Sequence, residues 1–175
     1  MKLIIASDIH GCLTYAQKLE KLINIEQPNN IILLGDILYF NQEISSPLEY
    51  DSHKTATILN KYQDKIIAVR GNCDSKSDDQ ILEFDITRNY IDIKIDDINF
   101  FLTHGHLTSW YIDKINGKVV LCGHTHQYNL DGQYINPGSV GIPRKSTKHT
   151  CIIYDKKTLF LIDLDDFSII EQKHL

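Results

Sequence analysis

Five short apolar segments in this chain each end abruptly in residues that can bind metal ions. The segments and the residues that follow them are 3–7 before Asp8 and His10, 31–34 before Asp36, 66–69 before Asn72 and Asp74, 100–103 before His104 and His106, and 119–122 before His124 and His126. Apolar segments of this length between turn residues are typical of buried strands, and ligands of open α/β sheets collect at the carboxyl ends of the strands. We therefore expect five strand ends to bring these side chains to one crevice.

The length and composition of the chain favour one domain. At 175 residues the chain can bury a substantial core but is short for two domains, so we expect a single domain over residues 1–175. Four cysteines without a C-x-x-C spacing, and an amino terminus without a signal-peptide core, lead us to expect reduced thiols in the cytoplasm. No segment approaches the roughly 20 apolar residues of a membrane span, and a net charge of -5 disfavours duplex nucleic acid as a partner.

The pattern of apolar residues predicts two halves with different kinds of sheet. A capping box from Thr14 to Gln17, followed by an apolar stripe, predicts a helix over residues 15–26. Ser52 is expected to cap a second helix, so the first 70 residues read as strand, helix, strand, helix, strand with a parallel sheet. From Tyr90 onward, alternating segments joined by turns predict antiparallel hairpins. We expect two sheets, the first with helices on its outer face.

The stretch from Ile37 to Asp51 has little periodicity and follows Asp36 directly. It is predicted to be a long loop, which either borders the crevice or serves as a solvated connection.

Each metal-binding motif is weak evidence when taken alone. Asp8, His10 and Asp36 are compatible with ordinary turns, and His124 with His126 fits either a surface loop or a transition-metal site. Their concentration is more informative, because five of the eight histidines lie in these strand-end motifs. Chance placement therefore explains the pattern poorly.

The order of the motifs resembles that of the calcineurin-like metallophosphoesterase superfamily. The motifs Asp-x-His, Gly-Asp, Gly-Asn-x-Asp, His and Gly-His-x-His span nearly the whole chain, and segments 69–74, 102–106 and 136–139 are similar to small bacterial YfcE-type phosphodiesterases. The resemblance implies an α/β fold with two mixed β-sheets packed as a four-layer α-β-β-α sandwich. It also implies two metal ions, one held by Asp8, His10, Asp36 and His126 and the other by Asp36, Asn72, His104 and His124.

A shared carboxylate suits such a pair of ions. Two divalent ions about 3.5 to 4 Å apart repel each other, and a bridging Asp36 reduces that repulsion. Imidazole, carboxylate and amide ligands favour a transition metal over magnesium, and the resemblance makes manganese the first expectation, with iron, zinc or nickel as alternatives. We expect a dinuclear metal-dependent phosphodiesterase in which a metal-bridging hydroxide attacks small-molecule phosphodiesters, without a protein nucleophile.

Three residues are candidates for catalysis beside the metals: Asn72, Cys73 and His106. Cys73 stands where many superfamily members have a histidine, a replacement that the YfcE-type proteins share, and it is either a weak proton donor or a small filler residue. His106 is either a second donor or an exposed loop histidine. Asp74 matches the acidic end of the family motif but equally fits a cap of a short helix near Ser77, so we do not count it as catalytic.

Other segments carry weaker hypotheses. Residues 136–139 form a turn by composition, and only the resemblance places them near the metals. The basic cluster from Arg144 to His149 would attract a phosphate or remain solvated. Trp110 and Tyr111 would stack on an aromatic leaving group or pack back onto the core.

Two alternative functions remain open at the level of sequence. The superfamily includes a retromer subunit that keeps the fold as a scaffold after losing metal ligands, so a non-catalytic interaction module is one alternative. Phosphomonoesterase or protein phosphatase activity is the other, and Cys73 argues against it only in part. Retention of every metal position favours the enzyme. A small-molecule substrate is the expected partner, no membrane partner is expected, and the sequence leaves a homo-oligomer open.

Overall fold

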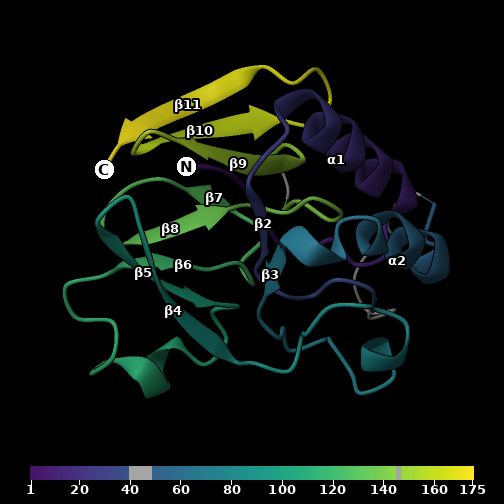
Figure 1. Cartoon of the computed structure of the whole chain (residues 1–175), viewed down its shortest axis with the longest axis horizontal. Helices are drawn as coiled ribbons and strands as arrows, with labels where there is room; N and C mark the ends of the chain where they lie inside the picture. Colours follow the sequence, from purple (N-terminus) through teal and green to yellow (C-terminus); the bar gives the residue numbers. More distant parts are fainter. Residues whose placement is uncertain (40–48, 145–146) are drawn as a thin grey trace.

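Two β-sheets pack face to face, and two α-helices cover the outer face of the first sheet (Figure 1). The structure is a computed structural model that describes residues 1–39, 49–144 and 147–175. The first sheet contains β1 (Lys2–Ala6), β2 (Asn30–Leu33), β3 (Ile66–Ala68), β9 (Thr150–Asp155), β10 (Thr158–Asp163) and β11 (Ile169–His174) in the order β11-β10-β9-β1-β2-β3. The second sheet contains β4 (Tyr90–Ile95), β5 (Ile98–Thr103), β6 (Val119–Leu121), β7 (Tyr128–Asn129) and β8 (Tyr134–Pro137) in the order β4-β5-β6-β8-β7.

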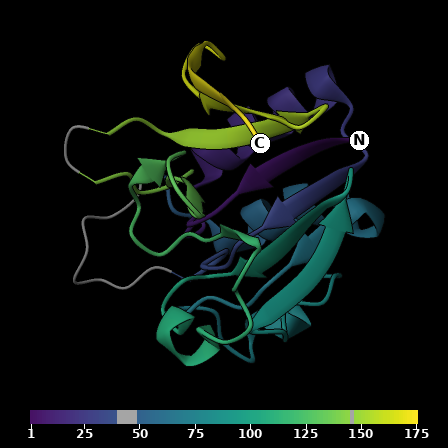
Figure 2. The ribbon, with the colours of Figure 1, turned by 90° about the vertical axis from the view of Figure 1, so that its left-hand side faces the viewer.

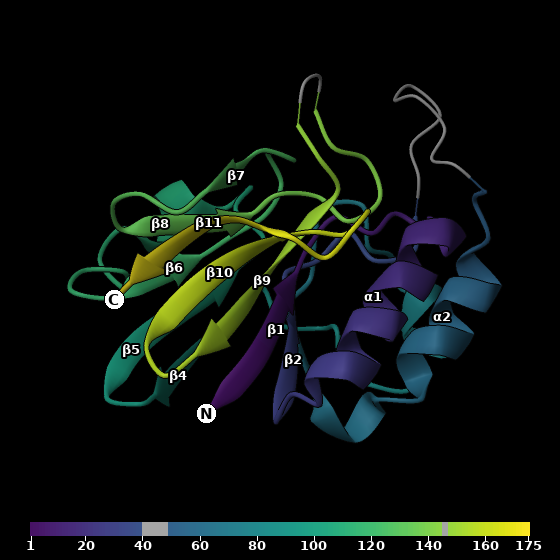
Figure 3. The same ribbon diagram turned by 90° about the horizontal axis from the view of Figure 1, so that it is seen from above.

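The helices lie over the parallel part of the first sheet. These are α1 (Leu13–Glu26) and α2 (Ser52–Asn60), and Figure 3 shows them side by side next to β1 and β2. Three short 3-10 helices complete the described elements: η1 (Gln63–Lys65), η2 (Asp78–Gln80) and η3 (Thr108–Tyr111). No helix in the described ranges is both long enough and apolar enough to cross a membrane.

The apolar segments at the start of the chain form buried parallel strands, as predicted. β1 pairs with β2, and β2 pairs with β3, both in parallel. Successive side chains of β1 alternate between two cores: Ile4 and Ala6 face the helices, whereas Leu3 and Ile5 face the second sheet. Because both faces of these strands are covered, their sequences are continuously apolar instead of alternating.

The prediction of antiparallel hairpins from Tyr90 onward is correct only in part. β4 and β5 form a hairpin, and β9, β10 and β11 form an antiparallel meander. However, β5 pairs with β6 and β6 pairs with β8 in parallel, so this part of the prediction is wrong. The chain between β5 and β6 and the chain between β6 and β8 are each too long for a tight turn, and each returns along the sheet in the same direction. β7 and β8 form a further antiparallel hairpin.

The C-terminal meander belongs to the first sheet, because β9 pairs with β1 in antiparallel fashion. Figure 2 shows these yellow-green strands beside the purple β1 and apart from the teal strands β4 and β5. Both sheets are therefore mixed, and the expected α/β fold class with two mixed sheets is confirmed.

The outer face of the second sheet is covered by η3 and the segment after it. Tyr111 packs against Tyr90 and Phe101, and Ile115 joins Phe101 and Val120 in a small third core. Within the described residues this fourth layer of the sandwich is thus a 3-10 helix with a turn. Tyr111 packs onto the core, which is one of the two outcomes expected for it, whereas Trp110 is 78% exposed.

Two predicted helix caps differ in the structure. α1 begins at Leu13 after Cys12, which makes no side-chain capping bond, and Thr14 instead donates to Glu49. α2 is capped by Asp51, which accepts a hydrogen bond from the Lys54 amide at 2.9 Å, one residue before the expected Ser52. In both cases the predicted cap lies inside the helix, where its side chain cannot reach the free amides of the first turn.

Candidate metal centre

Loops from both sheets meet at the carboxyl ends of β1, β2, β3, β5 and β6. The Asp8 amide donates to the Gly35 carbonyl at 3.1 Å, and the His10 amide donates to the Asp36 carbonyl at 3.0 Å. The second sheet joins this set, because the His124 amide donates to Asp8 Oδ2 at 3.0 Å. The structure thus brings together strand-end residues, such as Asp8 and His124, that are 116 positions apart in the sequence.

One group of ligand atoms is formed by Asp8, His10 and His126. His126 Nε2 lies 3.3 Å from Asp8 Oδ1, and His10 Nε2 lies 3.8 Å from the same oxygen. Asp8 Oδ1 and His10 Nε2 are buried and have no hydrogen-bond partner among the described residues. Buried acceptor atoms that face one another without a donor are unfavourable, and a cation placed between them removes the penalty.

A second group lies beside the first and contains Asp36, Asn72 and His104. His104 Nε2 is 3.3 Å from Asp36 Oδ2 and 3.0 Å from Asn72 Oδ1. The ring of His124 packs edge-on to His104 with their centroids 5.1 Å apart. Asp36 Oδ2 also lies 3.7 Å from His10 Nε2, so this one oxygen stands between the two groups.

Backbone carbonyls orient three of the histidines. His10 Nδ1 contacts the Tyr39 carbonyl at 2.7 Å, His104 Nδ1 contacts the Leu34 carbonyl at 2.7 Å, and His126 Nδ1 contacts the Ile142 carbonyl. Since a carbonyl only accepts, each Nδ1 carries the proton. Nε2 of His10 and His126 therefore presents a lone pair to the carboxylates, which is the arrangement of a metal-ligating imidazole.

The charges of the site are strongly coupled. Burial raises the pKa of the Asp8 carboxyl to about 6. Burial would also lower the pKa of His104, but the hydrogen bond to Asp36 and the charges of Asp8 and Asp36 outweigh it and raise that pKa to about 9. Burial opposes ionisation of Asp36, yet the hydrogen bond and the charge of His104 hold its pKa well below the usual range. Without a metal, a His104 imidazolium therefore balances the Asp36 carboxylate.

The backbone of the site adopts a conformation that most residues avoid. Asp8, His10, Asp36, His124 and His126 all have positive φ angles, between 50° and 68°. Such angles are unfavourable for residues other than glycine and concentrate where the surrounding structure needs a side chain in one place. Five of the seven predicted metal ligands share this feature.

Two glycines of the motifs allow the loops to approach closely. A Cβ atom on Gly71 would lie 2.1 Å from Asp36 Oδ1, and a Cβ on Gly123 would lie 2.6 Å from Asp8 Oδ2. Any larger residue at either position would displace a carboxylate of the site.

Asp74 plays a part that the sequence analysis missed. Its buried carboxylate accepts hydrogen bonds from three backbone amides: Asp36 at 2.9 Å, Ile37 at 2.8 Å and Gly71 at 2.7 Å. It therefore joins the loop after β2 to the loop after β3, which carry Asp36 and Asn72. Because Asp74 is directed inward, it does not cap the short helix η2, whose N-cap Ser77 makes no side-chain capping bond. Asp78, the first residue of that helix, accepts a hydrogen bond from the preceding Ser75 amide at 2.8 Å.

The comparisons with known proteins agree with this geometry. Residues 1–159 match the model of the calcineurin-like phosphoesterase superfamily domain. The chain belongs to the calcineurin-like phosphoesterase superfamily. It is 36% identical to phosphodiesterase YfcE of Escherichia coli (strain K12), over 98% of this chain and 97% of that protein. It is 32% identical to phosphodiesterase MJ0936 of Methanocaldococcus jannaschii, over 82% of this chain and 89% of that protein.

Two solved structures share the fold. The structure of the E. coli phosphoesterase Yfce matches with a TM-score of 0.88 at 35% identity, covering 99% of this chain and 98% of that chain. Vps29 of Entamoeba histolytica, in a structure with Zn2+, matches with a TM-score of 0.61 at 17% identity, covering 99% of this chain and 98% of that chain. The second likeness shows the fold alone.

Cys73 departs from the histidine that many members of the superfamily have at this position. Its sulfur, His10 and Asp36 offer ligand atoms within 4.8 Å of one another, so the side chain lies at the site. Burial, followed by the charge of Asp36, raises the pKa of the Cys73 thiol to about 12. The thiol is therefore neutral and a weak hydrogen-bond donor. The backbone amide of Cys73 has a separate role, because it donates to Asp36 Oδ1 at 2.8 Å.

His106 lies at the same edge of the site. Its ring centroid is 5.4 Å from that of His104 and 6.1 Å from that of His124. Its Nδ1 is buried and has no hydrogen-bond partner among the described residues. Burial and the charge of His104 lower the pKa of His106, so the ring is neutral at pH 7.

Residues 136–139 border the site, although composition alone favours an isolated turn. Asn136 donates to the Gly123 carbonyl at 2.8 Å, and Ser139 donates to the Asp8 carbonyl at 2.8 Å. The first two residues of this segment belong to β8, which carries them to the loops after β1 and β6. Only the resemblance pointed to this position.

The basic cluster is dispersed in the structure. Lys148 pairs with Asp163 at 2.6 Å, and His149 stacks on Tyr15 with ring centroids 3.4 Å apart. Arg144 lies beside the site, with its Nε 3.3 Å from the Thr125 carbonyl. Lys145 lies outside the described residues.

The loop predicted over 37–51 reaches the site at its start, where the Tyr39 carbonyl orients His10. Residues 40–48 of that prediction lie outside the described part of the chain.

Proposed function

We propose that this protein is a metal-dependent phosphodiesterase that acts on small-molecule phosphodiesters. The observation that carries the proposal is the position of Asp36 Oδ2 between two groups of ligand atoms. Beside it lie Asp8 Oδ1 and His10 Nε2, which have no hydrogen-bond partner in the described part of the chain. YfcE and MJ0936 are both named as phosphodiesterases, and the similarity to YfcE extends over 98% of this chain.

The donor set fits two ions that share Asp36. Asp8, His10, Asp36 and His126 would hold one ion, and Asp36, Asn72, His104 and His124 would hold the other. Mixed nitrogen and oxygen donors suit manganese, with iron, zinc or nickel as alternatives. When bound, such ions would supply a water of lowered pKa as the nucleophile and compensate charge on the phosphoryl oxygens.

The residues of the chain provide orientation and charge. The carbonyls of Tyr39, Leu34 and Ile142 keep three imidazoles directed at the site, and Asp36 remains anionic. The neutral thiol of Cys73 gives little acid assistance to a departing alkoxide. His106, whose ring centroid lies 5.4 Å from that of His104, is the other candidate to handle a proton. A diester with a good leaving group is therefore the favoured substrate.

The substitution Asp36→Asn tests the proposal, because it removes the shared anion while keeping the volume of the side chain. Wild-type protein loaded with Mn2+ should hydrolyse bis(p-nitrophenyl) phosphate, and the variant should lose at least about 100-fold in kcat with its circular dichroism unchanged. The matched control is Asp97→Asn in the exposed β4–β5 turn, which should keep wild-type activity.

Metal content measured alongside should show two ions per wild-type chain. Wild-type turnover in a metal-replete Asp36→Asn protein would contradict the shared-ligand mechanism. Faster hydrolysis of p-nitrophenyl phosphate than of the diester would instead support the phosphomonoesterase alternative.

A further inference from the structure

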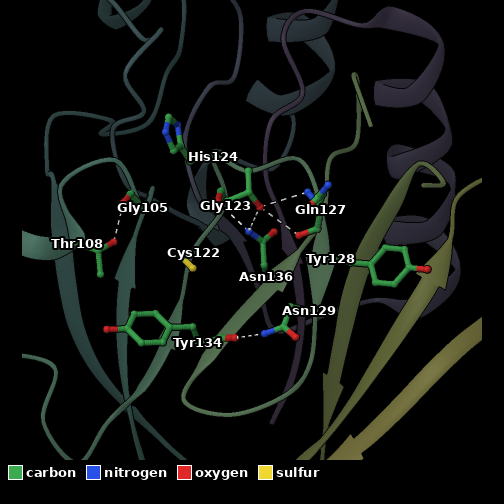
Figure 4. A pocket seen from close by; sticks show the side chains of 11 residues that line it. Gly105, Thr108, Cys122, Gly123, His124, Gln127, Tyr128, Asn129, Tyr134 and Asn136 are labelled. Carbon is green, nitrogen blue, oxygen red and sulfur yellow. Dashed lines mark hydrogen bonds between the residues drawn. The ribbon is translucent and has the colours of Figure 1, made fainter. Parts of the chain in front are cut away.

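A cavity of about 570 Å³ adjoins the metal centre on the outer side of the second sheet. It lies between the start of η3 and the strands β6, β7 and β8, and its lining includes Gly105, Gly123 and His124 from the loops of the site. Figure 4 shows His124 and the Tyr134 ring at opposite ends of the set of side chains that line it. The volume is within the range of about 300 to 1,000 Å³ typical of small-molecule pockets. We call this cavity the Tyr134 pocket.

Among the residues that the structure describes, no charged side chain lines the Tyr134 pocket, although the chain as a whole has a net charge of -5. Its walls are instead formed by aromatic, amide, hydroxyl, thiol, imidazole and glycine groups. Such a surface offers no counter-charge to a phosphoryl group. The phosphoryl group of a bound substrate would therefore remain at the metal centre, and an uncharged organic group is the part that the pocket can accept.

Several lining side chains are held by main-chain hydrogen bonds. Thr108 donates to the Gly105 carbonyl at 2.7 Å, Asn129 donates to the Tyr134 carbonyl at 2.7 Å, and Asn136 donates to the Gly123 carbonyl at 2.8 Å (Figure 4). These bonds give the pocket a preformed shape, which reduces the entropy lost on binding.

Two polar side-chain groups of the pocket lining are available to form hydrogen bonds with a ligand. The hydroxyl of Tyr134 and the side-chain amide of Gln127 form no hydrogen bond with the described residues, and both residues lie at the pocket surface. The Tyr134 ring adds an apolar face that a planar group can cover. The combination suits a ring that carries hydrogen-bonding groups, such as a nucleoside or a substituted aryl group.

We propose that the Tyr134 pocket binds an uncharged, ring-containing ester group of the substrate while the phosphoryl group occupies the metal centre. The inference rests on the proposed function, because it places the phosphoryl group at the metals. The pocket would thus determine which diesters are good substrates, and Tyr134 and Gln127 would be specificity residues.

Phosphonates with a single organic group provide the test. A diester has two organic groups, either of which could enter the pocket, whereas a phosphonate has only one. The dissociation constants of phenylphosphonate and methylphosphonate are measured by calorimetry on Mn2+-loaded protein. Burial of the ring should make the phenyl compound bind about tenfold more tightly. Tyr134→Ala removes the apolar face and Gln127→Trp fills the cavity, so each should reduce this ratio to within about twofold of one.

Ile112→Ala is the matched control, because Ile112 is exposed and does not line the cavity. It should keep the tenfold ratio. Equal affinities of the two phosphonates for wild-type protein, or an unchanged ratio in both pocket variants at full metal content, would overturn the proposal. Because binding is measured without turnover, a protein that binds the phosphonates as expected but hydrolyses no diester would contradict the proposed function and leave the pocket supported.

Discussion

Asp74 provides the most direct test of how the two halves of the metal centre are held together. Its carboxylate is only 8% exposed and accepts the amides of Asp36, Ile37 and Gly71. In Asp74→Asn, one side-chain oxygen can still accept the Asp36 and Gly71 amides, as Oδ2 does now. The new amide group would then face the Ile37 amide, which places two donors against each other in the interior.

The expected loss of stability follows from these bonds. A buried hydrogen bond to a charged acceptor contributes about 1.5 to 3 kcal/mol, and a buried donor without an acceptor costs about 1 to 3 kcal/mol. Burial raises the pKa of Asp74, so removal of the charge recovers part of this loss. We expect a decrease of about 3 kcal/mol in the free energy of unfolding of the metal-free protein. The displaced Asp36 loop should also weaken Mn2+ binding by about 10- to 100-fold.

The assay combines urea unfolding of the metal-free protein with Mn2+ titration against a chromophoric chelator. Asp78→Asn is the matched control, because Asp78 is 7% exposed and accepts one backbone amide away from the metal centre. An asparagine oxygen can keep that single bond, so this variant should lose about 1 kcal/mol or less and bind Mn2+ normally. Equal losses in the two variants, or wild-type Mn2+ affinity in Asp74→Asn, would refute the role assigned to Asp74.

Two further predictions concern pH and position 73. The raised pKa of about 9 keeps His104 protonated near neutral pH, so metal binding must release that proton. Below a pH of about 6, the carboxyl of Asp8 is protonated as well, and metal binding must also release its proton. Mn2+ affinity should therefore rise about tenfold per pH unit between about pH 6.5 and 8.5 and fall more steeply below pH 6, together with the diesterase rate. Competition with a chelator across this pH range measures the Mn2+ affinity. An affinity that does not change with pH would contradict the coupling between metal binding and proton release. Cys73→His should narrow the preference for aryl over alkyl esters by up to about 100-fold, because an imidazole can protonate a poor leaving group. Values of kcat/KM for matched esters at equal metal content decide this point, and an unchanged aryl-to-alkyl ratio would show that position 73 has no such role.

The sequence by itself determined the main layout of this protein. Each apolar segment stops at Asp8, Asp36, Asn72, His104 or His124, and parallel strands present their carboxyl ends at one edge. The parallel pairing of β1, β2 and β3 and the meeting of these strand ends are therefore readable from local pattern. Ligand chemistry is readable for the same reason, because it depends on residue type and on order along the chain.

Tertiary structure decided how those residues are divided and supported. His124 and His126 are two positions apart, yet His126 packs beside His10 and His124 beside His104. Both residues have positive φ angles, which local sequence does not predict. The role of Asp74 depends on amides 37 and 38 positions away in another loop. The Tyr134 pocket likewise lies beside the parallel pair β6 and β8, and such long-range pairing depends on packing that no short sequence window contains.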